Sequence, residues 1–317
     1  MNWTFAAEAL SATIPIYIII LAGFALRRFG FLKKESDSSF VRLSIDVCIP
    51  CFIFYNMLGN DKLKSIGLSL SCMSAGALGL MAALAVSYLF AKYLLKLKVG
   101  DGLRTFAVTT ATQNYGFFVV SMLFLLYPKD SPYLGIALTH NVGCDLVFWS
   151  LCFLLLARGV PFSIRLLLKG PVFAVFLALG IIWSGLNVYI PKFALNSLSM
   201  IGNASIPLNL IMFGCLLADF WGFGNINYKA LSVSVLIRMF IMPTIFIFAA
   251  YILPIDNALK TVLVFEAVAP CGVTAAVLAK HFGGNPQMSV QITVATSLLA
   301  LLVLPLWIVL GFKLLGL

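Results

Sequence analysis

The chain has 317 residues, of which 62% are apolar and only 10% are charged, and its mean hydropathy is +1.06. Soluble proteins carry about 25% charged residues, so this composition excludes a water-soluble globular enzyme and a disordered protein. The net charge of +10 comes from Lys and Arg at the edges of apolar runs. That placement is typical of topology signals and of contacts with anionic lipids, and it argues against nucleic-acid binding.

Ten apolar ranges divide the chain, and each is long enough to span a bilayer as a helix of about 20 residues. They are 9–26, 38–58, 68–94, 103–127, 132–157, 171–190, 197–220, 228–253, 259–281 and 287–315. The loops after the odd-numbered ranges carry most of the Lys and Arg residues. By the positive-inside rule these loops are cytoplasmic and both termini lie outside. We therefore expect an all-α polytopic membrane protein without a soluble domain.

Motifs of catalysis and metal binding are absent from the sequence. It contains no Walker loop, no zinc ligand set and no nucleophile with its base. Seven cysteines all fall inside apolar ranges, and we interpret them as packing residues rather than as disulfide or redox partners. We therefore expect no enzymatic activity, no cofactor and no bound metal. The cysteines are Cys48, Cys51, Cys72, Cys144, Cys152, Cys215 and Cys271.

Two matched stretches indicate that the halves of the chain are related. Residues around Pro50 (DVCIPCFIFYNML) resemble those around Pro207 (NASIPLNLIMFGCLL), at an offset of 157. Residues around Gly116 (TQNYGFFVV) resemble those around Gly272 (VAPCGVTAA), at an offset of 156. A repeat of five helices crosses the membrane an odd number of times, so its second copy is inverted, as in many transporters. We expect these repeats at 1–160 and 161–317, with the fourth helix in the first and the ninth in the second.

The fourth and ninth ranges contain polar and helix-breaking residues. Pro270 removes a backbone hydrogen bond, so we expect a break there. Asn114 and Pro270 each lie about 16 Å from the start of their range, near the membrane midplane. Interrupted helices that cross at this depth would direct free amides and helix N-termini toward an anion, whereas the alternative is a packing kink. The candidate substrate-binding residues are Gln113, Asn114, Tyr115, Gly116, Pro270, Cys271, Gly272 and Thr274.

Five ionisable residues lie inside apolar ranges, where charge is costly and usually faces a cavity or a partner. Arg238 and Glu266 fall at similar depths, so we expect an ion pair between the eighth and ninth helices, with proton coupling through Glu266 as the alternative. Asp46 and Asp145 share another depth and either bind a proton or cation together or are hydrogen-bonded separately. His140 is interpreted as an interior histidine whose ring is hydrogen-bonded within the protein, with a proton relay as the alternative.

Three stretches carry a resemblance to a known family. They are EAVAPCGVTAAVLAKHFGGNPQMSVQITVATSLLALLVLPLW (266–307), IGNASIPLNLIMFGCLLADF (201–220) and RMFIMP (238–243). With these landmarks the chain resembles the auxin efflux carrier family, which includes plant PIN-type auxin exporters and bacterial permeases for malonate or malate. The resemblance implies two inverted five-helix repeats whose fourth and ninth helices cross in a panel that moves against a scaffold. It also implies that Asn114 contacts the substrate, that Pro270 is the crossover proline and that the protein is a homodimer.

The chain departs from the family at the fourth helix. Many bacterial members have the pattern NxGxxGxP, whereas here the residues after Gly116 read FFVVS. We therefore expect the fourth helix to be less interrupted than usual. The resemblance implies a secondary transporter of small organic anions in the cell membrane. Its transport is coupled to protons, coupled to sodium, or simple facilitated flux. The alternatives are a sodium-coupled symporter of the bile-acid type and a membrane-embedded ligand sensor.

Overall fold

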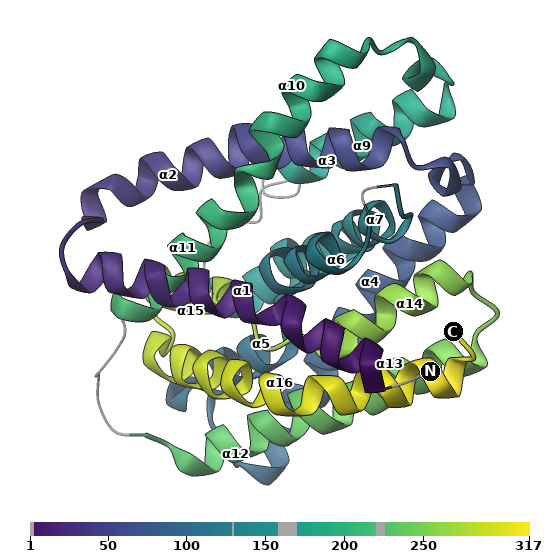
Figure 1. Cartoon of the computed structure of the whole chain (residues 1–317). Coiled ribbons are helices and arrows are strands. Elements are labelled where there is room, and N and C mark those ends of the chain that lie inside the picture. The colour runs from purple at the N-terminus through teal and green to yellow at the C-terminus, as the bar shows by residue number, and fades with distance from the viewer. Residues whose placement is uncertain (1–2, 129, 158–169, 220–225) are drawn as a thin grey trace.

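The computed structural model describes residues 3–128, 130–157, 170–219 and 226–317. The described chain is helical apart from turns, short connections and one isolated β-bridge (Figure 1). Seven of its helices are long and apolar enough to cross a membrane, which confirms the expected polytopic, all-helical membrane protein. These helices are Ala7–Arg28, Lys34–Leu58, Ile66–Leu94, Tyr133–Leu156, Lys192–Asp219, Tyr228–Ile252 and Pro286–Leu315. The expected boundary between the repeats, at 160/161, lies outside the described residues.

Several of these long helices are built from shorter elements joined end to end. Three are nearly unbroken: α1 (Trp3–Arg28), α4 (Ile66–Leu89) and α16 (Pro286–Leu315). The composite ones are α2 (Asp37–Leu43) with α3 (Ile49–Leu58), α7 (Tyr133–Val147) with α8 (Phe153–Leu156), α10 (Lys192–Asn203) with α11 (Ser205–Asp219), and α12 (Tyr228–Leu236) with α13 (Met242–Ile252). Wider π-helical turns at Ser44–Cys48 and Ile237–Ile241 precede Pro50 and Pro243. Such turns accommodate a proline that cannot donate a backbone hydrogen bond.

The remaining predicted ranges hold shorter helices. The sixth contains α9 (Gly170–Trp183), which ends seven residues early because the chain turns at Gly185 with φ +73°. The fourth contains α5 (Leu103–Ala111), a π-helical turn at Tyr115–Val119 and α6 (Val120–Leu126). The ninth contains α14 (Asn257–Ala267) and α15 (Thr274–His281). Both of the latter ranges are therefore interrupted in their middle.

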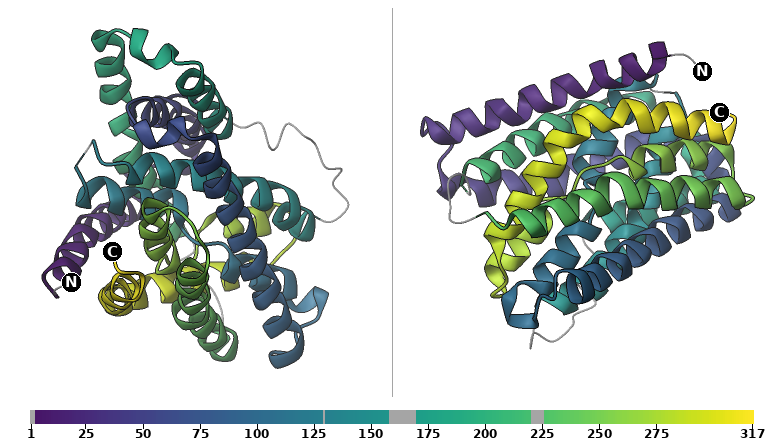
Figure 2. Two further views of the ribbon diagram at one scale, coloured as in Figure 1. Left: turned by 90° about the vertical axis from the view of Figure 1, so that its right-hand side faces the viewer. Right: turned by 90° about the horizontal axis from the view of Figure 1, so that it is seen from below.

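Glycines permit the closest helix packing in the molecule. Helix α4 lies along α7, and α1 lies along α11 (Figures 1 and 2). A Cβ on Gly76 would meet the His140 carbonyl, and one on Gly143 would meet the Met73 carbonyl. Small residues let the backbones of membrane helices approach in this way.

The outer surface is apolar and the interior contains polar groups, which is the reverse of a soluble protein. Large side chains such as Leu21, Leu78 and Leu302 are more than 60% exposed. Arg238 and Glu266, in contrast, are fully buried. This distribution suits a protein surrounded by lipid, since the bilayer core solvates apolar but not ionised groups.

Candidate functional site

The first break, Thr112–Asn114, separates α5 from the helical segment that begins at Tyr115. Thr112 has an extended backbone (φ −77°, ψ 106°), and Asn114 also lies outside the helical region (φ −82°, ψ 58°). The Asn114 side chain accepts a hydrogen bond from the Phe117 amide at 3.3 Å and so caps the following segment. The break therefore places the N-terminal end of a helical segment inside the molecule.

The second break, Val268–Val273, separates α14 from α15 and contains Pro270, as expected. Arg238 caps the main chain here. Its Nε donates to the Ala269 carbonyl at 2.8 Å, and its Nη2 donates to the Glu266 carbonyl at 2.9 Å. A guanidinium in this position pairs with carbonyls that the end of α14 leaves free and lies at the negative end of the helix dipole.

The two breaks pair with each other as antiparallel extended chain. The Asn114 amide donates to the Pro270 carbonyl at 2.7 Å, and the Gly272 amide donates to the Thr112 carbonyl at 2.8 Å. Gln113 lies opposite Cys271 in this short bridge. These bonds satisfy main-chain groups that have no helical partner. Such groups need a partner inside a membrane protein, because the bilayer core offers no water to bind them.

The fourth helix is interrupted by this pairing, and the expectation that it is less interrupted than is usual in the family stays a prediction. The segment after Gly116 lacks the second glycine and the proline of the family pattern, but the chain is nonhelical from Thr112 to Asn114 all the same. The physical reason is that main-chain partners from the second break replace the helical hydrogen bonds of the first. A proline is therefore not needed to hold this break open.

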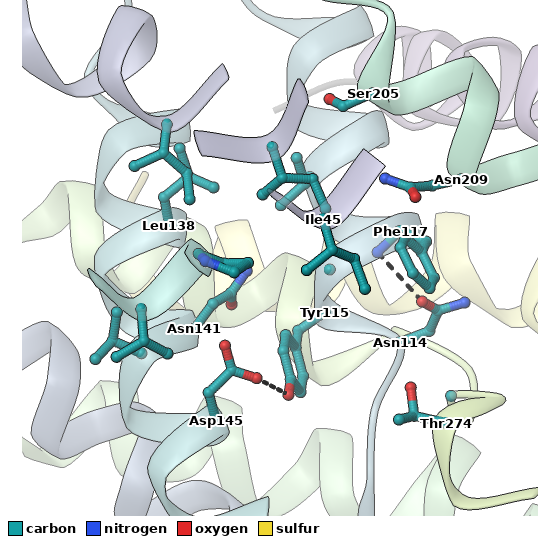
Figure 3. Close-up of a pocket in the computed structure, with 18 of the residues that line it drawn as sticks. Ile45, Asn114, Tyr115, Phe117, Leu138, Asn141, Asp145, Ser205, Asn209 and Thr274 are labelled. Atoms are coloured by element: carbon teal, nitrogen blue, oxygen red, sulfur yellow. Dashed lines mark hydrogen bonds between the residues drawn. The ribbon is translucent and has the colours of Figure 1, made fainter. Parts of the chain in front are cut away.

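A cavity of about 230 Å³ lies beside the paired breaks (Figure 3). Asn114 and Thr274 lie on one side of the view, and Asn141 and Asp145 lie on the other. Tyr115 donates from its hydroxyl to Asp145 Oδ1 at 2.6 Å. The polar residues of the lining are Thr112, Gln113, Asn114, Tyr115, Ser121, Asn141, Asp145, Ser205, Asn209 and Thr274. Because the rest of the lining is largely apolar, the cavity resembles a site for a small molecule with a few defined polar groups.

Most of the candidate binding residues from the sequence meet at this cavity. The lining includes Gln113, Asn114, Tyr115, Gly116, Gly272 and Thr274. Pro270 and Cys271 are instead part of the paired backbone, and the Cys271 amide donates to the Thr296 hydroxyl at 3.1 Å. Contact of these residues with a substrate remains a prediction.

The predicted ion pair between Arg238 and Glu266 is wrong in its details. The guanidinium binds the Glu266 main chain, while the Glu266 carboxylate faces the first break and α7. Gln113 Nε2 donates to Glu266 Oε2 at 3.3 Å, and His140 Nδ1 lies 3.5 Å from Glu266 Oε1. Depth along a helix predicts which residues are at one level, but it does not predict the direction in which a side chain points.

The two aspartates predicted at one depth lie in different surroundings. Asp46 is exposed on the helix that contains the Ser44–Cys48 turn and is not part of the described lining, whereas Asp145 lines the cavity and binds Tyr115. The structure therefore does not support a proton or cation shared by this pair.

Sequence reasoning missed several polar residues of the lining. Ser205 and Asn209 reach the cavity from α11, and Asn209 Oδ1 accepts a hydrogen bond from the Ser44 hydroxyl at 2.6 Å. Asn141 lines the cavity from α7. The signal for Asn209 was present, because it lies in the stretch around Pro207 that matches the first half of the chain. An amide side chain inside an apolar range, such as that of Asn209, is a candidate cavity residue for the same reason as Asn114.

Comparisons with known proteins agree with this geometry. The chain is 27% identical over 313 aligned residues to an uncharacterized transporter of Methanothermobacter thermautotrophicus, covering 93% of this chain and 95% of that protein. It is 22% identical over 326 aligned residues to an uncharacterized transporter of Methanocaldococcus jannaschii, covering 94% and 97%. The model of the membrane transport protein family matches residues 9–164 and 160–308. The chain therefore belongs to the membrane transport protein family, that of the auxin efflux carriers, and is an integral membrane transporter.

Proposed function

We propose that the protein is a secondary transporter that carries small organic anions by alternating access. The class we propose is carboxylates of the auxin or the malate and malonate kind. The observation that carries the proposal is the pairing of the two breaks beside the cavity, with Asn114 in both features. A helix N-terminus in the interior, at the positive end of the helix dipole, suits a carboxylate. Membership in a transporter family implies a carrier rather than an enzyme.

Roles for the individual residues follow from their positions. The Asn114 side-chain amide and the positive N-terminal end of the helical segment that begins at Tyr115 bind the carboxylate. Gln113, Tyr115 and Thr274 shape the pocket, and Gly116 and Gly272 leave room for the substrate beside the main chain. Pro270 and Cys271 maintain the pairing of the two breaks.

The proposed architecture is ten membrane helices in two inverted five-helix repeats, at 1–160 and 161–317. Helix contacts support this arrangement. Helix α1 packs on α11 and α9 packs on α3, so the first helix of each half contacts the second helix of the other. Helix α4 packs on α7, and α12 and α13 pack on α16, so the third helix contacts the fifth in each half. The two family matches also meet near residue 160.

The cellular setting is also part of the proposal. The protein functions in the cell membrane with both termini outside, as a homodimer held by its scaffold helices, and a proton or sodium ion drives the anion. The charge asymmetry of the loops supports the orientation. The dimer is supported by the resemblance to plant members of the family.

The test is uptake of radiolabelled malonate, malate, succinate, pyruvate and indole-3-acetate into proteoliposomes. Wild type is compared with Asn114→Ala, empty vesicles and Asn196→Ala, a matched amide that is exposed on α10. We expect at least one acid to enter with wild type and with Asn196→Ala but not with Asn114→Ala. Equal uptake by Asn114→Ala and wild type would contradict the assignment of this residue.

Two alternative functions give different results in the same experiment. A sodium-coupled symporter would require a sodium gradient for uptake of the acid. A sensor would bind an acid, seen as protection against thermal unfolding, without any flux. If none of the acids is transported or protects the protein, the proposed substrate class is wrong.

A further inference from the structure

Five polar side chains form a buried cluster between the cavity and the second break. They are Gln113, His140, Asn141, Arg238 and Glu266. The Glu266 carboxylate is at its centre. His140 Nδ1 lies 3.5 Å from Oε1, and Gln113 Nε2 donates to Oε2 at 3.3 Å. With its amide oriented toward Glu266, Asn141 also donates to Oε1 at 3.1 Å.

The charges of this cluster depend on a single proton. Arginine side chains remain protonated in proteins, so the buried Arg238 requires a negative charge nearby. An ionised Glu266 supplies it, so the cluster is neutral while His140 is neutral. A proton bound on His140 faces the carboxylate and makes the cluster positive by one unit. His140, Arg238 and Glu266 are each fully buried, so this change of charge is weakly screened by water.

Two members of the cluster connect it to the proposed substrate cavity. Gln113 and Asn141 both line the cavity and both contact Glu266. One side chain therefore separates the cavity from the carboxylate. Within the described residues, His140 Nε2 and Gln113 Oε1 are buried without a hydrogen-bond partner. Unsatisfied buried polar atoms are costly and often belong to functional sites.

On the basis of the proposed anion transport, we infer that His140 and Glu266 form the proton-binding site that couples the movement of the anion to a proton. The proton binds His140 Nδ1 opposite Glu266 Oε1 and leaves when the anion leaves. The positive cluster favours an anion in the cavity, and the anion in turn favours the bound proton. This reciprocity is the thermodynamic basis of coupling between two ligands.

Other titratable groups lie around this site. On α7, Cys144 Sγ is 3.9 Å from His140 Nδ1, and Asp145 faces the cavity. The second break supplies Cys271, whose Sγ is 3.8 Å from the Thr110 carbonyl. Helix α4 contacts this part of α7 through Gly76. The assignment to His140 and Glu266 rests on their direct contact and on the link from Glu266 to the cavity.

The experiment separates coupling from transport in proteoliposomes that contain the full chain. Counterflow exchanges labelled for unlabelled anion and needs no net proton movement, whereas accumulation against a gradient needs the proton. We expect Glu266→Gln, which leaves the cluster positive without a proton, to keep counterflow but to lose accumulation driven by an imposed pH gradient. His140→Gln, which leaves the cluster neutral, should also lose this accumulation and should bind the anion more weakly. Glu266→Asp, which keeps the carboxylate, should retain accumulation at a lower rate. Matched controls are Glu8→Gln and His281→Gln, both exposed and remote from the cavity.

A second measurement uses wild type alone and does not depend on the folding of any variant. Adding an anion transported in counterflow, at a pH where it is fully ionised, to weakly buffered protein in detergent should make the solution more alkaline, because the site takes up a proton. The inference would be overturned if the protein takes up no proton when the anion is added, or if pH-driven accumulation persists in both glutamine variants. A folded Glu266→Gln variant that loses counterflow as well, or accumulation that follows sodium, would also overturn it. Absence of counterflow by wild type for every acid would instead refute the proposed anion transport.

Discussion

Tyr115 links the first break to a neighbouring helix. It is the first residue after Asn114, and its hydroxyl donates to Asp145 Oδ1 on α7 at 2.6 Å. A hydrogen bond to a carboxylate is stronger than one between neutral groups. The contact therefore fixes the first turn of the helical segment whose N-terminal end lies at the cavity, and with it the position of the proposed anion-binding groups.

We predict that Tyr115→Phe weakens substrate binding. Loss of a hydrogen bond to a charged group costs about 1.5–3 kcal/mol, so the KM for the transported acid should rise roughly tenfold or more. The measurement is initial uptake against substrate concentration. Tyr251→Phe, which removes a hydroxyl from an exposed side chain, serves as control and should behave as wild type. An unchanged KM in Tyr115→Phe would show that the bond does not position the site.

At this scale the sequence predicts which residues are interior but not how they pair. A polar side chain inside an apolar range is costly next to lipid, so Gln113 and Asn114 could be selected without a structure. Partners depend on helix rotation and on packing from distant parts of the chain. For that reason depth along the helices pairs the Glu266 carboxylate with Arg238, although it contacts Gln113 and faces His140.

At the scale of elements, Arg238 holds the end of α14 in place. It lies in the π-helical turn between α12 and α13, and its guanidinium bonds two carbonyls at 2.8 and 2.9 Å. We predict that Arg238→Ala lowers the free energy of unfolding by about 3 kcal/mol or more, because buried carbonyls lose a charged donor. Thermal unfolding in detergent measures this effect.

A suitable control for this prediction is Arg28→Ala, because Arg28 is exposed at the end of α1. Low concentrations of methylguanidinium should raise the unfolding temperature of Arg238→Ala but not that of wild type, since the ion fits the vacated space. Equal unfolding temperatures of the two alanine variants would contradict a role for Arg238 in holding the break.

The packing of α4 on α7 gives another prediction. A Cβ on Gly143 would clash with the Met73 carbonyl and lie 2.8 Å from the Ala77 amide, whereas Gly180 on α9 has open space. We expect Gly143→Ala to destabilise the protein by about 1–3 kcal/mol, as overpacking does, and Gly180→Ala to have little effect. A difference in unfolding temperature between the two variants measures this. If both unfold like wild type, the helices are not as close as described.

Helix positions were predictable from apolar runs, but their interruptions were less so. Pro270 indicates its own break through its missing amide. The first break has no proline, and it depends on hydrogen bonds to residues more than 150 positions away. The early end of α9 depends on a left-handed glycine at 185, which a hydropathy pattern does not detect.

At the scale of the whole molecule, ion pairs connect loops at both ends of the helices. Lys62, after α3, pairs with Asp256, before α14, at 2.8 Å. Arg27 at the end of α1 pairs with Asp219 at the end of α11, at 3.4 Å. Burial raises the pKa of Asp256, but the hydrogen bond from Lys62 and the α14 amides lower it more, so the carboxylate stays ionised well below neutral pH. The start of α1 and the end of α16 also lie close together (Figures 1 and 2).

These contacts agree with the proposed alternation of crossings, in which the ends of even-numbered helices share one side and the ends of odd-numbered helices share the other. The distribution of Lys and Arg, by contrast, indicates which of the two sides is cytoplasmic. Termini on the same side require an even number of crossings, which the ten proposed helices satisfy.

The orientation itself leads to a labelling prediction. Glu35 lies in the first turn of the helix Lys34–Leu58, and Asp61 lies beyond the other end of this helix. Both side chains are exposed. We expect a membrane-impermeant maleimide to label Asp61→Cys in intact cells and to label Glu35→Cys only after permeabilisation, because the proposed orientation places the positive loops in the cytoplasm. Six of the seven native cysteines are buried, so a cysteine-retaining parent should give little background. Labelling in the opposite order would place both termini inside, and labelling of both sites in intact cells would mean that this helix does not cross the membrane.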